Sequence, residues 1–153
     1  QGEIWISGPV VIPQYWNKPD ANRDNFVNGY WKSGDLGAMD KDGFLSVFDR
    51  KKDMINRGGF KIFSAEVENV IMGLTGVVEC AIIGKPDPVL TERVCAIVVV
   101  EPGASVRPED VRAHCARRLS DYKTPEFVTV RMEPLPRNAN GKVLKPQLRK
   151  DLG

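Results

Sequence analysis

The segment PRNANGK, residues 136–142, combines turn-forming residues with a terminal lysine. Pro restricts φ, whereas Asn and Gly tolerate positive φ, so the segment predicts a tight surface loop with Lys142 at its end. Most lysines in such a position are solvated charges; the alternative is that the loop delivers an ammonium group to an anionic ligand. The spacing does not match the nucleotide-binding pattern G-x-x-x-x-G-K-[ST], which requires Gly at Pro136 and a hydroxyl at Val143. The rest of the sequence must decide between the two roles of Lys142.

Histidine and cysteine chemistry has little support in the sequence. The one histidine, His114, lies in a predicted helix, so a Ser-His-Asp triad or a histidine-based metal site lacks partners. The three cysteines, Cys80, Cys95 and Cys115, show no C-x-x-C or other ligand spacing and are predicted to be small buried residues. We therefore predict no metal site formed by this chain.

The composition is that of a globular protein rather than of a nucleic-acid-binding or membrane-spanning one. The 153 residues include 22 basic and 20 acidic side chains, a net charge of +2, which provides no broad phosphate-binding surface. No apolar run approaches the ~20 residues that a membrane helix needs, and no charged and apolar leader opens the chain. We expect a cytoplasmic location, no nucleic-acid partner and no membrane span; the oligomeric state stays open.

Residues 1–49 are predicted to form strands and turns. The alternation in EIWISG indicates a strand, whereas YWNKPDANRDNF is typical of a loop with at most one helical turn. The segment LGAMDKDGFLSVFDR predicts two strands around the turn DKDG. Because no amphipathic helix covers these strands, we expect them to need a partner surface.

Residues 54–153 are predicted to form a small α+β domain, with a short mixed sheet packed by two to three helices. Ser64 is expected to cap a first helix, and Pro108 to open a second. The segments VVECAIIG, RVCAIVVVE and FVTVRM predict strands, the first two buried on both faces or nearly so. The charged residues 50–53 separate the two parts, as a hinge or as an ordinary solvated turn.

Four motifs in order, YWKSGDLG, DRKKDMINRGGFKIFSAEVE, YKTPEFV and PRNANGK, together resemble the C-terminal part of the adenylate-forming enzymes. That superfamily includes acyl-CoA synthetases, luciferases and peptide-synthetase adenylation domains. The initial GEIWISGP is also similar to a strand motif of the family, so the resemblance covers almost the whole chain. DRKKDMI and GGFKIFSAEVE are more similar to acyl-CoA ligases than to adenylation domains, which tend to carry GRxDxQVKIRG. The resemblance implies that residues 1–49 are the end of a large adenylation domain and that residues 54–153 are a mobile AMP-binding domain.

The resemblance also implies where the nucleotide binds. Asp35 matches the aspartate that accepts hydrogen bonds from the ribose hydroxyls of ATP or AMP, a role that suits a carboxylate because it offers only acceptors. Ser33 replaces the commoner Thr of that motif and keeps the hydroxyl. Arg50 matches a second ribose-contacting residue. Lys52 matches the hinge about which the small domain swings between two half-reactions.

Further positions match less specifically. Gly58 and Gly59 resemble the loop that lines the thiol tunnel after the swing, because glycine allows close approach of backbone to a ligand. A plain turn is the alternative, since paired glycines form turns on their own. Lys61 and Asn56 match positions that are catalytic or ligand-facing in some members of the superfamily.

By the same resemblance, Lys142 is the lysine that reaches the reacting centre when a carboxylate attacks the α-phosphate of ATP. Asn140 stands where Ser or Thr is commoner. The complete reaction would convert a carboxylic acid, ATP and CoA into acyl-CoA, AMP and pyrophosphate, with Mg²⁺ on the phosphates. ATP, Mg²⁺ and CoA are thus expected as ligands of the full-length enzyme, none bound tightly by this chain alone.

The chain starts with Gln1, so we expect it to be processed or to be part of a longer protein. The expected partner is a large N-terminal adenylation domain that holds the acyl pocket, which leaves the acid unidentified and residues 1–153 inactive alone. Two alternatives stay open. The chain is a standalone module that binds nucleotide, CoA or another protein without catalysis, or it serves an enzyme that charges a carrier protein.

Overall fold

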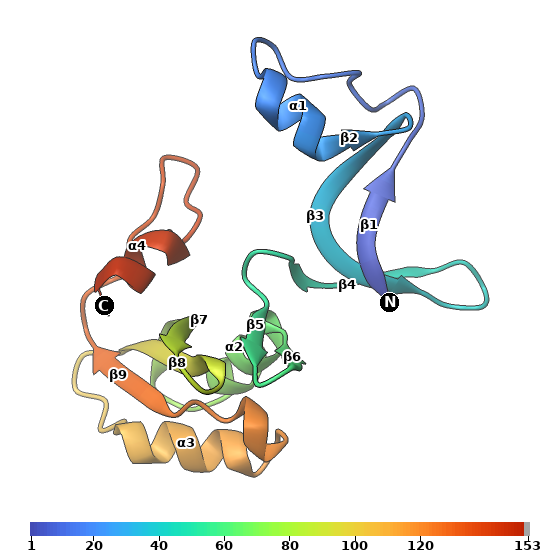
Figure 1. The fold of residues 1–153 in the computed structure, drawn as a ribbon. Coiled ribbons are helices and arrows are strands. Elements are labelled where there is room, and N and C mark those ends of the chain that lie inside the picture. Colours follow the sequence, from blue (N-terminus) through green and yellow to red (C-terminus); the bar gives the residue numbers. More distant parts are fainter. Residues whose placement is uncertain (152–153) are drawn as a thin grey trace. The chain divides into compact units, whose positions relative to one another are not determined.

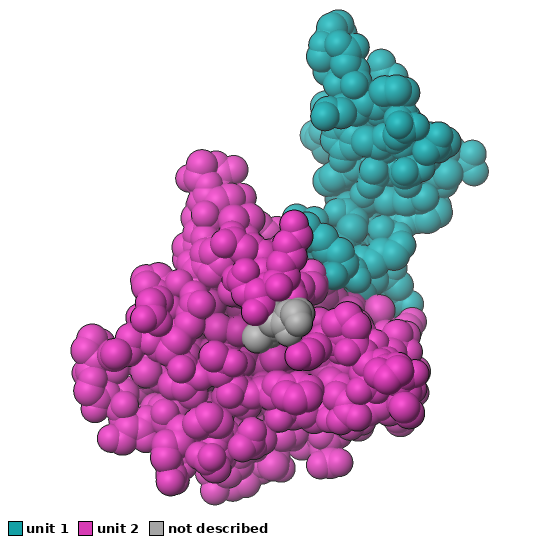
Figure 2. Space-filling model, turned by 60° about the vertical axis from the view of Figure 1, so that its left-hand side comes forward, with its two compact units in different colours: residues 1–52 teal, residues 53–153 magenta. Residues whose placement is uncertain are grey.

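The computed structural model describes residues 1–151, and the chain divides into two compact units, residues 1–52 and residues 53–153 (Figure 2). Unit 1 is the part up to Lys52, and unit 2 is the part from Asp53. The predicted domain limits and the hinge at residues 50–53 remain predictions.

Unit 1 is an antiparallel sheet centred on its longest strand. Strand β3 pairs with β1, β2 and β4, and the single helix α1 precedes β2 (Figure 1). The bounds are β1 Gly2–Ile6, α1 Pro19–Asn25, β2 Phe26–Val27, β3 Tyr30–Met39 and β4 Leu45–Arg50. The turn between β3 and β4 is closed by Asp40, whose Oδ1 accepts hydrogen bonds from the backbone N–H groups of Asp42 and Phe44 at 2.9 Å. The predicted strand pair around DKDG is therefore confirmed.

Apolar side chains of unit 1 stay largely in contact with solvent. Trp5, Met39 and Val47 are exposed by 46%, 69% and 62%. Every buried hydrophobic side chain among the described residues belongs instead to unit 2. These observations agree with the expectation that the strands of unit 1 lack a covering helix layer of their own.

Unit 2 is an α+β domain built on a mixed sheet, as predicted. The sheet order is β6-β5-β8-β7, all antiparallel, and β9 adds to β8 in parallel. The strands are β5 Ile55–Arg57, β6 Phe60–Ile62, β7 Val77–Asp87, β8 Thr91–Val100 and β9 Phe127–Arg131. The helices are α2 Ser64–Met72, α3 Pro108–Ala116, the 3₁₀ turn Asp121–Lys123 and α4 Lys145–Asp151.

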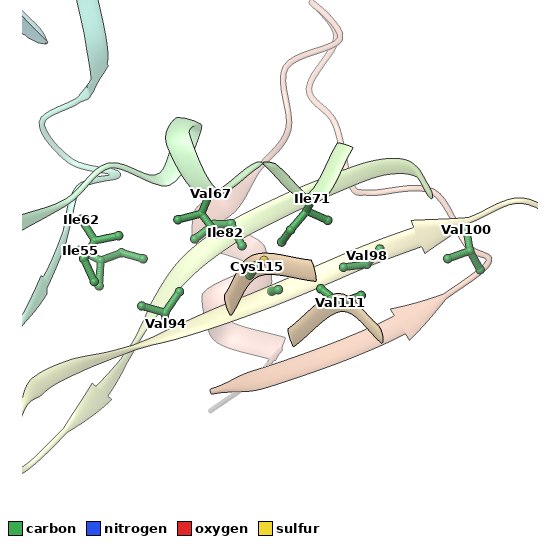
Figure 3. Close-up of a cluster of buried hydrophobic side chains, with 11 residues drawn as sticks. Ile55, Ile62, Val67, Ile71, Ile82, Val94, Val98, Val100, Val111 and Cys115 are labelled. Atoms are coloured by element: carbon green, nitrogen blue, oxygen red, sulfur yellow. The ribbon is translucent and has the colours of Figure 1, made fainter. Parts of the chain in front are cut away.

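One face of the central strands packs on helices α2 and α3. Ile82 and Val98 from the sheet lie with Val67 and Ile71 of α2 and with Val111 of α3 (Figure 3). These side chains are fully or almost fully buried. Because each fully buried aliphatic side chain contributes about 1.5–3 kcal/mol through removal of apolar surface from water, this cluster is the main source of stability in unit 2.

The opposite face of the same strands packs under helix α4. Ile83 and Ile97 belong to a second buried cluster with Leu135 and Leu148, against which Val143 also packs. The strands are thus buried on both faces, which explains why their sequences are continuously apolar rather than alternating. Leu135, Val143 and Leu148 also tie both flanks of the Lys142 loop to the core.

The predicted capping role of Ser64 is wrong. The residue that caps α2 is Phe63, and Ser64 lies in the first turn of the helix, fully buried. Its hydroxyl accepts a hydrogen bond from Lys145 Nζ at 2.7 Å. A capping serine stands at the N-cap itself, whereas Ser64 is one residue further on, and its hydroxyl accepts from Lys145 of helix α4.

The cysteines and the histidine behave as packing residues. All three cysteines are free thiols; Cys95 and Cys115 are buried as predicted, whereas Cys80 is only partly buried. His114 is buried with its Nε2 at 2.9 Å from the carbonyl oxygen of Val70. Burial raises the pKa of the Cys80 thiol to about 12 and that of Cys115 to about 11, and it also raises the pKa of Cys95.

These pKa values predict slow reaction of the native thiols, because only the thiolate is nucleophilic. With folded-state pKa values above the ordinary one, all three thiols stay protonated at pH 8. We expect iodoacetamide to leave them unmodified for as long as it takes to alkylate glutathione completely, and mass spectrometry measures the outcome. In guanidinium chloride all three should react. Rapid alkylation of the native chain would contradict the described burial.

Candidate functional site

Asp35 and Arg50, the two predicted ribose-contacting residues, lie side by side in unit 1. Their Cα atoms are direct partners across strands β3 and β4, and Arg50 Nε lies 3.0 Å from Asp35 Oδ1. The side chains are 34% and 45% exposed, so both reach solvent. Asp35 lies within strand β3, and its ion pair with Arg50 joins two neighbouring strands of the sheet.

The backbone before Asp35 is shaped by Ser33 and Gly34. The buried Ser33 hydroxyl donates to the carbonyl of Ile4 at 2.9 Å and accepts from the backbone N–H of Asp35 at 3.0 Å. Gly34 has φ +76, a conformation that side chains with a Cβ rarely adopt. Arg50 also donates to the Ser33 carbonyl at 3.2 Å. The SGD sequence therefore fixes the backbone at Asp35 through a hydroxyl that Ser or Thr can supply, and Arg50 contacts the carboxylate.

A surface pocket of about 550 Å³ adjoins this part of unit 1. Four of the side chains that line it are basic: Lys32, Arg50, Lys51 and Lys52. Part of this charge is balanced, because Lys51 Nζ lies 2.9 Å from Glu3 Oε2 and holds the pKa of Glu3 below its ordinary value. Asp24 also lines the pocket, and Arg50 is paired with Asp35, so much of the positive charge around the pocket is compensated within unit 1.

The predicted residues of the thiol loop lie on one β-hairpin in unit 2. Asn56 and Lys61 are direct partners across β5 and β6, and Gly58 and Gly59 form the connection between them with φ +57 and +92. Positive φ at both positions is the requirement of a two-residue type I′ turn. Asn56 Oδ1 accepts the Gly59 N–H at 3.0 Å. The glycines thus form the plain turn that was one of the two interpretations, and the tunnel stays a prediction.

Residues of the YKTPEFV motif hold this hairpin and helix α2 in place. Glu126 Oε1 lies 2.8 Å from Arg57 Nε, and Glu126 Oε2 lies 2.6 Å from Arg93. Burial raises the pKa of Glu126, but the two guanidinium groups outweigh it and bring the pKa below its ordinary value. Lys123 Nζ contacts both carboxylate oxygens of Glu66 at 2.7 and 2.8 Å. The motifs YKTPEFV and DRKKDMINRGGFKIFSAEVE, which are far apart in the sequence, are therefore in direct contact.

Lys142 is exposed and belongs to a short hairpin between β9 and α4. Figure 1 shows the segment between these two elements as a projecting loop. The hairpin closes through a bridge between Arg137 and Val143 and through a hydrogen bond from Asn138 N to Lys142 O at 2.9 Å. Asn138 Oδ1 in turn accepts the backbone N–H groups of Asn140 and Lys142 at 3.0 and 2.9 Å. The loop therefore fixes the backbone of Lys142 while its ammonium group reaches solvent.

Three of the residues that shape this loop were missed by the sequence analysis. Asn138 had a local signal, because an Asn side chain that bonds backbone N–H groups further along the chain is typical of turns. Glu79 and Arg137 had none, because their contact joins residues 58 apart in sequence. Long-range pairs of this kind are visible only in the folded chain.

Lys52, the predicted hinge residue, is the last residue of unit 1 and lines the pocket there; the other predicted site residues form three groups. Asp35 and Arg50 are paired in unit 1, the hairpin from Asn56 to Lys61 forms a second group, and Lys142 stands on its own loop in unit 2. No described contact joins Lys142 to the hairpin residues. Within residues 1–151, no group of three or more His, Cys, Asp or Glu side chains is arranged to hold a metal ion, and no helix is long and apolar enough to cross a membrane.

Proteins similar in sequence to this chain include a CoA ligase and a CoA synthase. The chain is 43% identical over 149 residues to the long-chain-fatty-acid–CoA ligase FadD13 of Mycobacterium tuberculosis, covering 97% of this chain and 29% of the relative. It is 41% identical over 153 residues to a feruloyl-CoA synthase of Amycolatopsis sp, covering 100% of this chain and 31% of the relative. The chain therefore spans about 30% of the length of these relatives.

Solved structures of adenylate-forming enzymes match the fold. ATP-bound MatB from Rhodopseudomonas palustris superposes with a TM-score of 0.90 at 36% identity, covering 98% of this chain and 30% of that one. The o-succinylbenzoate CoA synthetase MenE from Bacillus subtilis, in complex with its acyl-adenylate intermediate, gives a TM-score of 0.89 at 39% identity, covering 97% and 30%.

The α+β fold is that of the C-terminal region of adenylate-forming enzymes. A profile of the AMP-binding enzyme C-terminal domain matches residues 66–142, ending on the lysine of the projecting loop, and the chain belongs to this family. The resemblance found in the four motifs is thereby confirmed.

Proposed function

We propose that this chain is the C-terminal part of an ATP-dependent, AMP-forming acyl-CoA ligase. The reaction is carboxylate plus ATP plus CoA to acyl-CoA, AMP and pyrophosphate, through an acyl-adenylate. The observation that carries the proposal is the exposed Lys142 on an ordered loop. The names of the relatives support the reaction class, because they describe ligases that join a carboxylic acid to CoA.

Lys142 is the proposed catalytic residue of the first half-reaction. A carboxylate oxygen attacks the α-phosphorus of ATP, a P–O bond forms, and the bond to the bridging oxygen breaks as pyrophosphate leaves. In that transition state, negative charge moves from the attacking carboxylate across the transferred group to the leaving pyrophosphate, and all three groups crowd together. A compact ammonium between them stabilises this charge more than it stabilises the separate ground-state groups, which is the condition for a faster reaction.

Asp35 and Arg50 are the proposed ribose-binding pair. A carboxylate can accept hydrogen bonds from two neighbouring hydroxyls because each of its oxygens has acceptor capacity. Arg50 Nε lies 3.0 Å from Asp35 Oδ1 and holds that carboxylate in one orientation. The pair thus offers a preformed acceptor for a cis-diol, which costs less ordering on binding than two mobile side chains would.

The second half-reaction is proposed to use the hairpin from Asn56 to Lys61. The CoA thiolate attacks the acyl carbonyl of the adenylate, a C–S bond forms, and AMP leaves with the electrons of the C–O bond. Gly58 and Gly59 would let the pantetheine arm pass close to backbone. Lys61 and Asn56 are the ligand-facing candidates beside them. Lys52 is the proposed hinge about which the small domain rotates between the two half-reactions.

Mg²⁺ would enter this reaction with the nucleotide phosphates. The residues that the structure describes contain no acidic cluster suited to hold it. We therefore assign no residue of this chain to the metal.

The test compares the complete protein with residues 1–153. With ATP, Mg²⁺, CoA and a panel of fatty and aromatic acids, the complete protein is expected to form acyl-CoA and AMP, measured by chromatography and mass spectrometry. Residues 1–153 alone are expected to form neither acyl-adenylate nor acyl-CoA, because the acyl pocket lies in the preceding domain. Acyl-CoA production by residues 1–153 would overturn this division of labour.

The same assay separates the alternatives. Acyl transfer to a carrier-protein pantetheine but not to CoA would assign the chain to an enzyme that charges carrier proteins. The intact mass of the protein and its reading frame show whether a domain precedes this chain. If neither includes such a domain, a noncatalytic binding module is favoured.

A further inference from the structure

The loop that carries Lys142 is held at its base by a carboxylate from the neighbouring strand β7. Glu79 Oε1 accepts the backbone N–H of Leu135 at 2.8 Å, and Glu79 Oε2 pairs with the guanidinium group of Arg137. The Glu79 side chain is only 18% exposed, and Leu135 is buried in the second core cluster. One carboxylate therefore fixes two positions of the segment that leads into the loop.

Arg137 passes this constraint to the tip of the loop. Its second terminal nitrogen, Nη1, donates to the carbonyl oxygen of Gly141 at 2.6 Å. Gly141 is the residue before Lys142, has φ +77, and shares its carbonyl group with the peptide bond that bears the Lys142 N–H. A planar guanidinium can bind a carboxylate and a carbonyl at once in fixed directions, which a lysine in its place cannot do.

The other end of the loop is fixed as well. Lys145, three residues after Lys142, places its Nζ 2.7 Å from Glu68 Oε1 and 2.7 Å from Ser64 Oγ on helix α2. Glu68 Oε1 also accepts the Ile82 N–H of strand β7 at 2.8 Å. The loop thus stands between two anchored bases. Within it, the backbone of Lys142 is held by Asn138, and Arg137 links the Gly141 carbonyl to Glu79 on strand β7.

We propose that Glu79 and Arg137 are positioning residues for Lys142, acting through the Gly141 carbonyl. The inference rests on the proposed function of Lys142 in adenylation. Neither residue touches a substrate. They lower the conformational freedom of the loop before ATP and acid bind, so that less ordering remains to be done in the transition state.

The test uses the complete enzyme with Arg137→Lys and Glu79→Gln. Arg137→Lys keeps a positive charge but loses the fork between Glu79 and Gly141; Glu79→Gln weakens the attraction for Arg137 while retaining an acceptor for the Leu135 N–H. Both are expected to slow acyl-adenylate formation about tenfold, less than the roughly 100-fold that a displacement of about 1 Å at a reacting group produces. Thioester formation from supplied acyl-adenylate should keep its rate. Arg112→Lys is the matched control, since Arg112 lies on helix α3 and only approaches Glu109 at 4.0 Å.

A double variant separates positioning from a general effect on the fold. If Arg137 acts through Lys142, then adding Arg137→Lys to Lys142→Gln should cost no further adenylation activity. A further tenfold loss in that background, or an equal loss in both half-reactions of the single variant, would overturn the proposal. Unchanged adenylation in both single variants would overturn it too.

Hydrogen exchange gives a readout that needs no activity. Peptides covering residues 136–144 contain the hydrogen-bonded N–H groups of Asn138, Gly141 and Lys142. Both variants, and not Arg112→Lys, are expected to exchange these amides about tenfold faster, because removal of a charged contact loosens a local hydrogen-bonded unit. Unchanged exchange of these amides in both variants would show that Glu79 and Arg137 do not order the loop, and it would overturn the proposal. A wild-type enzyme that forms no acyl-adenylate would instead overturn the proposed function, while the exchange data still decide whether Glu79 and Arg137 order the loop.

Discussion

Replacing Lys142 by Gln in the complete enzyme is expected to lower acyl-adenylate formation about 100-fold or more, the scale of losing one preorganised electrostatic contact to a transition state. Gln keeps the length and polarity of the side chain but removes the positive charge. ATP–pyrophosphate exchange dependent on the acid measures this half-reaction directly. The effect should fall on kcat more than on KM, because the charge that Lys142 meets develops during phosphoryl transfer.

Two comparisons make this result specific. Lys150→Gln, which removes an exposed lysine of helix α4 in the same unit, is expected to retain wild-type adenylation. Thioester formation from supplied acyl-adenylate should be retained in both variants, since no phosphorus bond to pyrophosphate is broken there. Normal pyrophosphate exchange by Lys142→Gln would remove the catalytic role and leave only the family assignment.

The order of strands and helices in unit 2 was predictable because its core is strongly patterned. Apolar residues recur at helical spacing at Val67 and Ile71, and the strands around Ile82 and Val98 are continuously apolar, so the period of burial is visible in the sequence. The mixed sheet followed from two long strands and a third after a helix. Confirmation of the fold thus came from the residues that contribute most apolar burial.

Local sequence signals were less reliable where contacts with distant parts of the chain decide the structure. Ser64 stands where a capping serine is typical, yet its hydroxyl bonds Lys145, which lies 81 residues further along the chain. The sequence predicted a possible turn at Gly58 and Gly59 but not the hairpin from Ile55 to Ile62, because strands of three residues are too short to show a period. Tertiary contacts decide both cases.

The candidate site was predictable to the extent that its residues belong to contiguous motifs. The pairing of Asp35 with Arg50 joins two motifs through strand register, which the sequence does not state, and the anchoring of the Lys142 loop by Glu79 crosses 58 residues of sequence. A motif therefore indicates which side chains meet a ligand, whereas the residues that hold those side chains are dispersed. In this structure the supporting residues are partly buried charged side chains that pair with each other and bond the backbone near the site.

Asp35→Ala is expected to lower kcat/KM for ATP about 10- to 100-fold, the range for losing hydrogen bonds to a charged acceptor. The measurement is the ATP dependence of acid-dependent pyrophosphate exchange by the complete enzyme. The loss comes from two causes, the missing acceptor and the unpaired Arg50 that was 3.0 Å from the carboxylate. Asp42→Asn, at an exposed position of the β3–β4 turn in the same sheet, is the control that should retain wild-type kinetics.

Deoxynucleotides separate the ribose contact from a general weakening of the sheet. The wild-type enzyme is expected to prefer ATP over 2′-deoxy-ATP or 3′-deoxy-ATP, because each analogue lacks one of the two hydroxyls that would donate a hydrogen bond to Asp35. In Asp35→Ala this preference should fall toward one, because neither hydroxyl then has its acceptor. A variant that loses activity but keeps the wild-type preference would place Asp35 in the support of the sheet rather than at the ribose, and it would shift the proposed nucleotide contact to the basic pocket beside Arg50.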